Sequence, residues 1–176
     1  MTYKSNNGED IPQAEIDTLI AYFMSKIPPQ MRDQLNYSPK SLDVVEGWLQ
    51  ERYSEEHCSL FWDEYDEDWV EGEEIKPGWI PDPKLIRGAV FYIGEVHHKL
   101  VGGNWRVYKE ESDLKWGYPW NYDAFPVIEG SNWAEVICPL IWIADAICKP
   151  YSDPVQLSQN LAAHLSSIKR ENKNNQ

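Results

Sequence analysis

The chain has 176 residues, 42% of them hydrophobic and 26% charged, which is the composition of one soluble globular domain with a substantial core. Its net charge of −13 and its pI of about 4.6 oppose contact with nucleic acid and with anionic membranes, and we expect neither kind of partner. Basic protein partners are favoured instead, although the same charge also serves simple solubility.

The cysteines and the N-terminus suggest a reducing compartment. Cys58, Cys138 and Cys148 are odd in number and form no Cys-x-x-Cys motif, so neither a zinc knuckle nor a secreted disulfide framework is predicted. The first residues contain no basic stretch followed by an apolar run, so no signal peptide is predicted. The longest apolar stretch, Cys138–Ile147, is too short to span a membrane. We expect a cytoplasmic protein without a cofactor or a structural disulfide.

The N-terminal half is predicted to be helical. Residues 1–10 are polar and are expected to form a flexible tail, with Asp10 placed to cap a helix from Pro12 to Ile27. A second helix is predicted from Ser41 to Tyr53, with Ser38 before Pro39 as an alternative start. The apolar residues at helical spacing in these two helices are Ile16, Leu19, Ile20, Phe23, Ile27, Leu42, Val45, Trp48, Leu49 and Tyr53.

The second half combines helices with strands. The longest helix is predicted for residues 83–100 and is ended by Gly102-Gly103. Its apolar stripe contains Leu85, Ile86, Ala89, Val90, Ile93, Val96 and Leu100. Strands are predicted for 104–109, 124–130 and 132–139, the last two joined as a hairpin around Glu129–Asn132.

Two more helices complete the predicted fold. One covers 139–148, and the other runs from Asp153-Pro154 to Ile168, ahead of a flexible tail at 169–176. The buried positions of this last helix are Leu157, Leu161, Leu165 and Ile168. We therefore predict one α+β domain over 11–168, with about five helices packed on a small antiparallel sheet.

Glu95, His97 and His98 are the candidate metal ligands. Successive helical residues point about 100° apart, so His97 and His98 cannot both bind one metal ion, whereas Glu95 and His98 can. Glu-x-x-His is the unit of di-iron helix bundles, but those sites need a second copy, which this chain lacks. On a helical wheel Glu95 and His98 lie opposite the apolar stripe, which predicts a solvent-exposed pair and a surface contact between Glu95 and Lys99. His97 and His98 fall in the last turn, where a cation is favourable.

Other combinations that suggest chemistry are weak. His57-Cys58 suggests an activated thiol, but the eleven acidic residues between Glu51 and Glu74 would raise the thiol pKa. Residues 63–74 have the length of an EF-hand loop, yet Tyr65 and Asp68 occupy the positions of a ligand and of the required glycine. His164 lies at the edge of the last helix's stripe and is interpreted as structural.

The segment 54–82, here called the acidic segment, combines acids with bulky aromatic side chains. It belongs to a chain with nine Trp and ten Tyr, and we expect some of these to line an interface. Two interpretations fit: a surface that docks on a basic partner with a hydrophobic notch, or a loop whose Trp62 and Trp69 cover the core. The candidate partner-binding residues are Trp62, Asp63, Glu64, Tyr65, Asp66, Glu67, Asp68 and Trp69.

Two segments also suggest a relationship. "NYSPKSLDVVEGWL" (36–49) and "GAVFYIGEVHHKLVGGNW" (88–105), followed by "FPVIEG" and a Pro-led final section, resemble a loose group of small bacterial cytoplasmic proteins without assigned function. That group has a YSPESL segment before a helix of the pattern YxGEVxxxxxGGxW. The resemblance implies a compact α+β fold, with Gly94 as a close-packing point, Gly102-Gly103 as the helix stop and Trp105 as a strand anchor. It implies no established chemistry, and an immunity-like role only by association.

These observations favour a non-enzymatic, acidic binding protein that neutralises or regulates a basic protein partner. Carboxylates would speed the encounter and aromatic side chains would anchor the contact. The alternative is a metal-assisted hydrolase that uses Glu95, His97 and His98. The sequence does not predict the oligomeric state.

Overall fold

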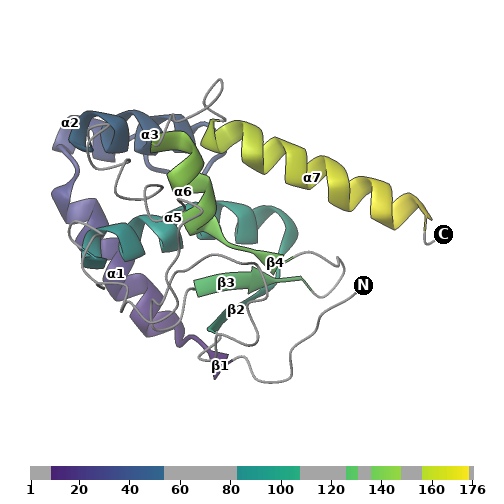
Figure 1. Ribbon diagram of the computed structural model, residues 1–176. Helices are drawn as coiled ribbons and strands as arrows, with labels where there is room; N and C mark the ends of the chain where they lie inside the picture. The colour runs from purple at the N-terminus through teal and green to yellow at the C-terminus, as the bar shows by residue number, and fades with distance from the viewer. Residues whose placement is uncertain (1–8, 54–82, 108–125, 131–135, 148–155, 175–176) are drawn as a thin grey trace, which may run out of the picture.

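The computed structural model describes residues 9–53, 83–107, 126–130, 136–147 and 156–174 (Figure 1). Within these residues the chain forms the α+β fold predicted from the sequence, with six helices and a four-stranded antiparallel sheet. The elements in chain order are β1 (Glu9–Asp10), α1 (Gln13–Lys26), α2 (Pro29–Arg32), α3 (Ser41–Arg52), α5 (Pro83–Val101), β2 (Asn104–Val107), β3 (Pro126–Glu129), β4 (Val136–Ile137), α6 (Pro139–Ile147) and α7 (Leu157–Asn174).

Helices α1 and α3 bury the apolar stripes that their sequences predict. Ile16, Ile20 and Phe23 of α1 enter the core, Leu19 packs against it while only partly buried, and Ile27 follows directly after the helix. All five predicted positions of α3 and its C-cap are buried as well. The helical period of the sequence therefore identifies the core face of both helices correctly.

Helix α5 is the central element of the fold. Every residue from Leu85 to His97 is buried except Arg87, so the helix is covered on nearly all sides. It packs most extensively against α1 and also contacts α6 and β3. The close contact with α1 depends on Gly88, because a Cβ there would lie 2.4 Å from the carbonyl oxygen of Leu19. Leu100, predicted to be buried, is 47% exposed in the last turn.

The turn after α5 reverses the chain and leads it into the sheet. Gly102 and Gly103 adopt positive φ angles of 76° and 115°, a conformation that disfavours residues with a Cβ, and the amide of Gly102 donates to the carbonyl of His98 at 2.8 Å. The chain then reverses into β2, which pairs antiparallel with β3, and β3 pairs antiparallel with β4. Glu129 pairs with Val136, so the β3–β4 connection comprises residues 130–135 and is longer than the predicted turn.

The fourth strand comes from the predicted N-terminal tail, and this part of the prediction is wrong. Glu9 and Asp10 form β1 and pair with Val107 and Arg106 of β2. Asp10 does not cap α1, since the N-cap is Pro12 and has no side-chain hydrogen bond. Its carboxylate instead forms an ion pair with Arg106 at 2.8 Å. Residues 9 and 10 form a strand because they pair with β2, which is distant from them in the sequence.

Two helices also depart from the predicted boundaries. The short helix α2 lies between the two predicted N-terminal helices, where no helix is predicted, and Pro29 occupies its first turn, where proline is tolerated. Helix α7 continues to Asn174, although the sequence predicts an end near Ile168 and a flexible tail after it. The buried positions Leu157, Leu161 and Ile168 agree with the prediction.

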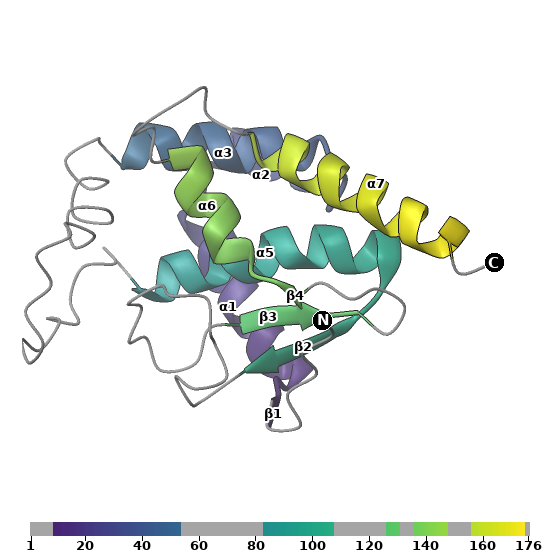
Figure 2. The same ribbon diagram turned by 45° about the vertical axis from the view of Figure 1, so that its right-hand side comes forward.

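The elements are arranged in layers around α5. Figure 2 shows the sheet on one side of α5 and helices α3, α6 and α7 on the other, while α1 crosses α5. The C-terminal end of α3 and the N-terminal end of α5 lie on the same side of the molecule, and α7 ends on the opposite side (Figure 2). No helix in the described part of the chain is both long enough and apolar enough to cross a bilayer.

Candidate functional site

The two segments that suggested a relationship meet in the structure. The amide of Tyr37 donates to Tyr92 Oη at 3.2 Å, and Tyr92 Oη in turn donates to Ser41 Oγ at 2.8 Å. Ser41 Oγ then donates to the carbonyl of Ser38 at 2.6 Å. Tyr92 and Ser41 are buried, so this chain of hydrogen bonds satisfies polar groups in the core. It fixes the entry of α3 against α5.

Tyr37 occupies an unusual position within this network. Its φ of 60° lies in the left-handed region, which bulky residues seldom adopt. Its ring stacks on Tyr92 with centroids 4.8 Å apart, and Lys99 Nζ lies 3.5 Å from its centroid. Burial raises the Tyr37 pKa, and the neighbouring Tyr92, Glu95 and Asp17 raise it further. The phenol is therefore neutral at physiological pH.

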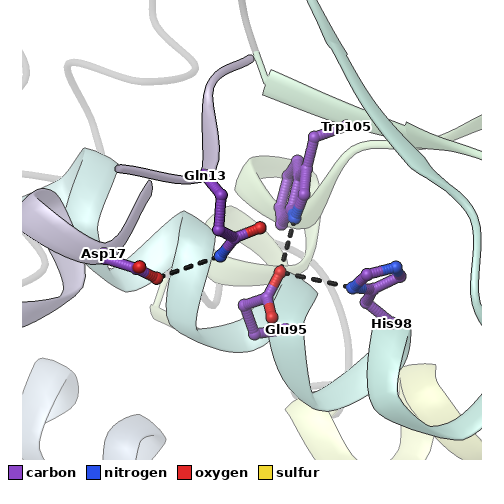
Figure 3. Close-up of polar contacts among 5 residues, drawn as sticks. All are labelled: Gln13, Asp17, Glu95, His98 and Trp105. Carbon is purple, nitrogen blue, oxygen red and sulfur yellow. Dashed lines mark hydrogen bonds and ion pairs between the residues drawn. The ribbon is translucent and has the colours of Figure 1, made fainter. Parts of the chain in front are cut away.

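Glu95 is buried, which corrects the prediction that it faces solvent. Its Oε1 accepts a hydrogen bond of 2.7 Å from the indole Nε1–H of Trp105 and lies 3.5 Å from Nδ1 of His98. Figure 3 shows these two contacts of Glu95, and also Gln13 of α1, whose Nε2 donates to Asp17 Oδ1 at 2.9 Å. The helical-wheel prediction is wrong because β2 folds back over the face of α5 that the wheel assigns to solvent. The side chain of Lys99 contacts the ring of Tyr37. Because Glu95 is buried, the predicted surface pair between Glu95 and Lys99 is wrong.

Gly94 and Trp105 have the roles that the resemblance implied. A Cβ on Gly94 would lie 2.1 Å from Cη2 of Trp105, so only glycine admits the indole. Trp105 is 6% exposed and packs edge-on against Phe91, with ring centroids 4.9 Å apart. Strand β2 is thus held against α5 by the Trp105 indole, which fills the space beside Gly94 and donates a hydrogen bond to the Glu95 carboxylate.

His97 points into the opposite side of α5, away from Glu95 and His98. Its Nε2 lies 2.9 Å from Nδ1 of His164 on α7, and its ring packs edge-on against Trp142 of α6 at 6.2 Å. Burial, with the added effect of His164 and His98, lowers the His97 pKa to about 4. His97 is therefore neutral at pH 7 and is not the cation that its place in the last turn suggests.

The candidate ligands Glu95, His97 and His98 are thus not brought together. Glu95 and His98 face Trp105, whereas His97 faces α7. The described residues contain no group of three histidine, cysteine or acidic side chains that could hold a metal ion. His57, Cys58, Cys148 and residues 63–74 lie outside the described residues, and Cys138 is a free thiol whose pKa is raised by burial.

The candidate partner-binding residues, Trp62 to Trp69, also lie outside the described residues. The structure does show where their segment is attached: it connects Tyr53, the C-cap of α3, to Pro83, the first residue of α5. The chain's charge is concentrated there, with eleven acidic residues and one lysine in residues 54–82. The residues that the structure describes contain twelve acidic side chains against eleven lysines and arginines. The described part of the chain is therefore almost neutral.

Comparison of the chain with protein-family models, with curated proteins and with solved structures gives no match in any of the three.

The sequence missed the contact between His97 and His164. The two histidines belong to different helices, and no local sequence pattern relates residues that are 67 positions apart. The available signal was the position of His164 at the edge of an apolar stripe, which indicated burial but not the partner. Tyr92 was missed for a similar reason, because its hydroxyl is satisfied by Ser41 and Tyr37, which precede it by a long interval in the chain.

Proposed function

We propose that this protein is a non-enzymatic binding protein that neutralises or regulates a basic protein partner through its acidic segment. The proposal is immunity- or inhibitor-like in type: one protein covers a cationic surface of another. The supporting observation is the division of charge along the chain. Residues 54–82 carry a net charge of −10 out of −13, and the described body is nearly balanced.

This division argues against charge that serves solubility alone. Acids that only keep a protein soluble are spread over its surface, mixed with bases. Here Asp63, Glu64, Asp66, Glu67 and Asp68 follow one another almost without interruption. A concentrated field of this kind steers a cationic partner and raises the rate of association.

Trp62, Tyr65 and Trp69 would supply the anchors of the contact. Trp and Tyr are enriched among the residues that carry most of the binding energy at protein interfaces. They alternate here with carboxylates, which matches a partner surface that has lysines and arginines around a hydrophobic notch. The combination favours a folded basic protein over a simple polycation, because a polycation offers no notch.

The test begins with the products of neighbouring genes in the native host as candidate partners, and measures binding by calorimetry. We expect Trp62→Ala or Trp69→Ala to weaken binding by about 2 kcal/mol or more, roughly 30-fold. Asp66→Lys should mainly slow association, and the affinity should fall with added salt.

The matched control is Asp33→Lys, which makes the same charge change at an exposed residue outside the acidic segment. It should leave the affinity nearly unchanged. Polylysine serves as a probe for non-specific attraction and should bind without sensitivity to Trp62→Ala. If the combined Trp62→Ala, Asp66→Lys, Trp69→Ala variant folds normally and binds the partner as tightly as the wild type, the proposal is wrong.

A further inference from the structure

His97 and His164 lie where three helices meet. His97 of α5 is 0% exposed and His164 of α7 is 8% exposed. Their nearest ring nitrogens, Nε2 and Nδ1, are 2.9 Å apart, and the ring centroids are 4.9 Å apart. Trp142 of α6 packs edge-on against His97. The pair is thus a buried polar contact between α5 and α7.

The geometry requires that at least one of the two imidazoles is neutral. In a hydrogen bond between two ring nitrogens one ring donates and the other accepts, so one ring must present a lone pair. If both rings were protonated, two N–H groups would face each other at this distance, and two positive charges would be buried together. The contact therefore depends on the protonation state of the pair.

The described surroundings also oppose a positive charge at His97. Among the described residues, His164 from α7 and His98 from its own helix lower the His97 pKa in the same direction as burial. From α6, the neighbour is the uncharged indole of Trp142. A released α7 would expose both rings to water and let His97 take up a proton near its usual pKa of about 6.5.

A second polar contact holds the beginning of α7. The amide of Leu157, the first residue of the helix, donates to Glu46 Oε2 of α3 at 2.8 Å. The apolar contacts of Leu157 and Leu161 with the core belong to the same half of the helix. The histidine pair lies further along α7, near the middle of the helix, so it restrains this part, while Glu46 restrains the N-terminal end.

We propose that the His97–His164 pair is an acid-sensitive latch, which holds the middle of α7 on α5 while the pair is neutral and releases it on acidification. The sign follows from linkage. The relevant pH range lies between the usual histidine pKa and the lower pKa of His97 in the docked state. In this range the released state binds more protons than the docked state, so release becomes more favourable as pH falls. The docked helix is fully stabilised above about pH 6.5.

Hydrogen exchange of the full-length protein tests the latch, with rates corrected for the intrinsic pH dependence of exchange. We expect the protection of amides in residues 161–168 to fall up to tenfold for each pH unit below about 6.5. The decrease should level off near pH 4, the pKa of His97 in the docked state. Protection of α1 and of the first half of α5 should stay constant over the same range. Equal loss of protection in all helices, or no loss in α7, would overturn the proposal.

Variants separate the pair from its neighbours. His97→Gln with His164→Asn places amide groups near the two ring nitrogens, so it keeps a hydrogen bond but removes the titration. In this variant the pH dependence of α7 exchange should disappear. His98→Gln should retain it. If Glu46→Gln abolishes the pH dependence of α7 exchange and the double variant does not, the Glu46 carboxylate that contacts the start of α7 is the sensor. The proposed latch is then wrong.

NMR of the imidazole nitrogens in the wild-type protein gives a result that does not depend on any variant's folding. We expect His97 to remain neutral as long as α7 is protected, and to become protonated together with its release. A protonated His97 at about pH 6 in a protein whose α7 is still protected would contradict the latch.

Discussion

Gly94 illustrates how a single missing side chain positions a whole strand. The indole of Trp105 occupies the space where any Cβ at residue 94 would lie, and its Nε1–H reaches the carboxylate of Glu95. The glycine and the acid are adjacent in the sequence, but they act together only because the chain reverses at Gly102-Gly103. Packing and hydrogen bonding then reinforce each other at one contact.

We predict that Gly94→Ala lowers the free energy of unfolding by about 1–3 kcal/mol, because the new methyl group overlaps Trp105, which is itself buried and cannot move freely. Chemical unfolding measures the loss. The control is Gly47→Ala in α3, where a Cβ would have no neighbour within 4 Å. That change should stabilise the protein by about 0.5–1 kcal/mol, because alanine is the better helix former. Equal effects of the two substitutions would contradict the close contact described for Gly94.

At the scale of elements, β1 shows how a very short strand is held at the edge of a sheet. It pairs with β2 over only two residues. Arg106 in β2 forms an ion pair with Asp10 of β1 at 2.8 Å and approaches Glu129 of β3 at 3.5 Å. One guanidinium therefore contacts both neighbouring strands. Such cross-strand pairs contribute modestly when exposed, so their effect should be local.

We expect Arg106→Gln to loosen β1 without unfolding the rest of the protein. Amide exchange of residues 9–11 should become severalfold faster, whereas the β2–β3 pairing should keep its protection, because it has four paired positions. Glu129→Gln removes only the longer contact and should affect β1 less. A loss of more than about 1 kcal/mol in the global free energy of unfolding would show that the ion pairs hold more than the edge strand.

At the scale of the whole molecule, most of the net charge belongs to residues 54–82, outside the described residues. The described body has nearly equal numbers of acids and bases, and its core is a continuous apolar cluster that involves every helix except the short α2. The acidic segment is inserted between two helices that this core already holds. The charges of residues 54–82 should therefore contribute little to folding, and like charges in sequence repel each other.

We predict that replacing Asp63, Glu64, Asp66, Glu67 and Asp68 together by their amides leaves the thermal midpoint unchanged or raises it, most clearly at low salt. Glu46→Gln is the reference, because it removes the charge of a buried carboxylate that accepts a hydrogen bond from the Leu157 amide, and it should lower the midpoint. If the fivefold variant loses stability instead, the segment's carboxylates stabilise the fold, which favours the interpretation of the segment as a lid.

The sequence by itself determined the α+β class, the core faces of α1 and α3, the helical identity of α5 and its end at Gly102-Gly103. These features depend on local physics: a repeat of apolar residues at the helical period, and the freedom of glycine at positive φ. Tertiary structure decided the rest. Glu95 is buried because β2 returns over it, His97 is neutral because α7 brings His164 to it, and residues 9–10 are a strand because β2 offers them a partner. Contacts between residues far apart in the chain leave no periodic signal, so the sequence of each element could not reveal them.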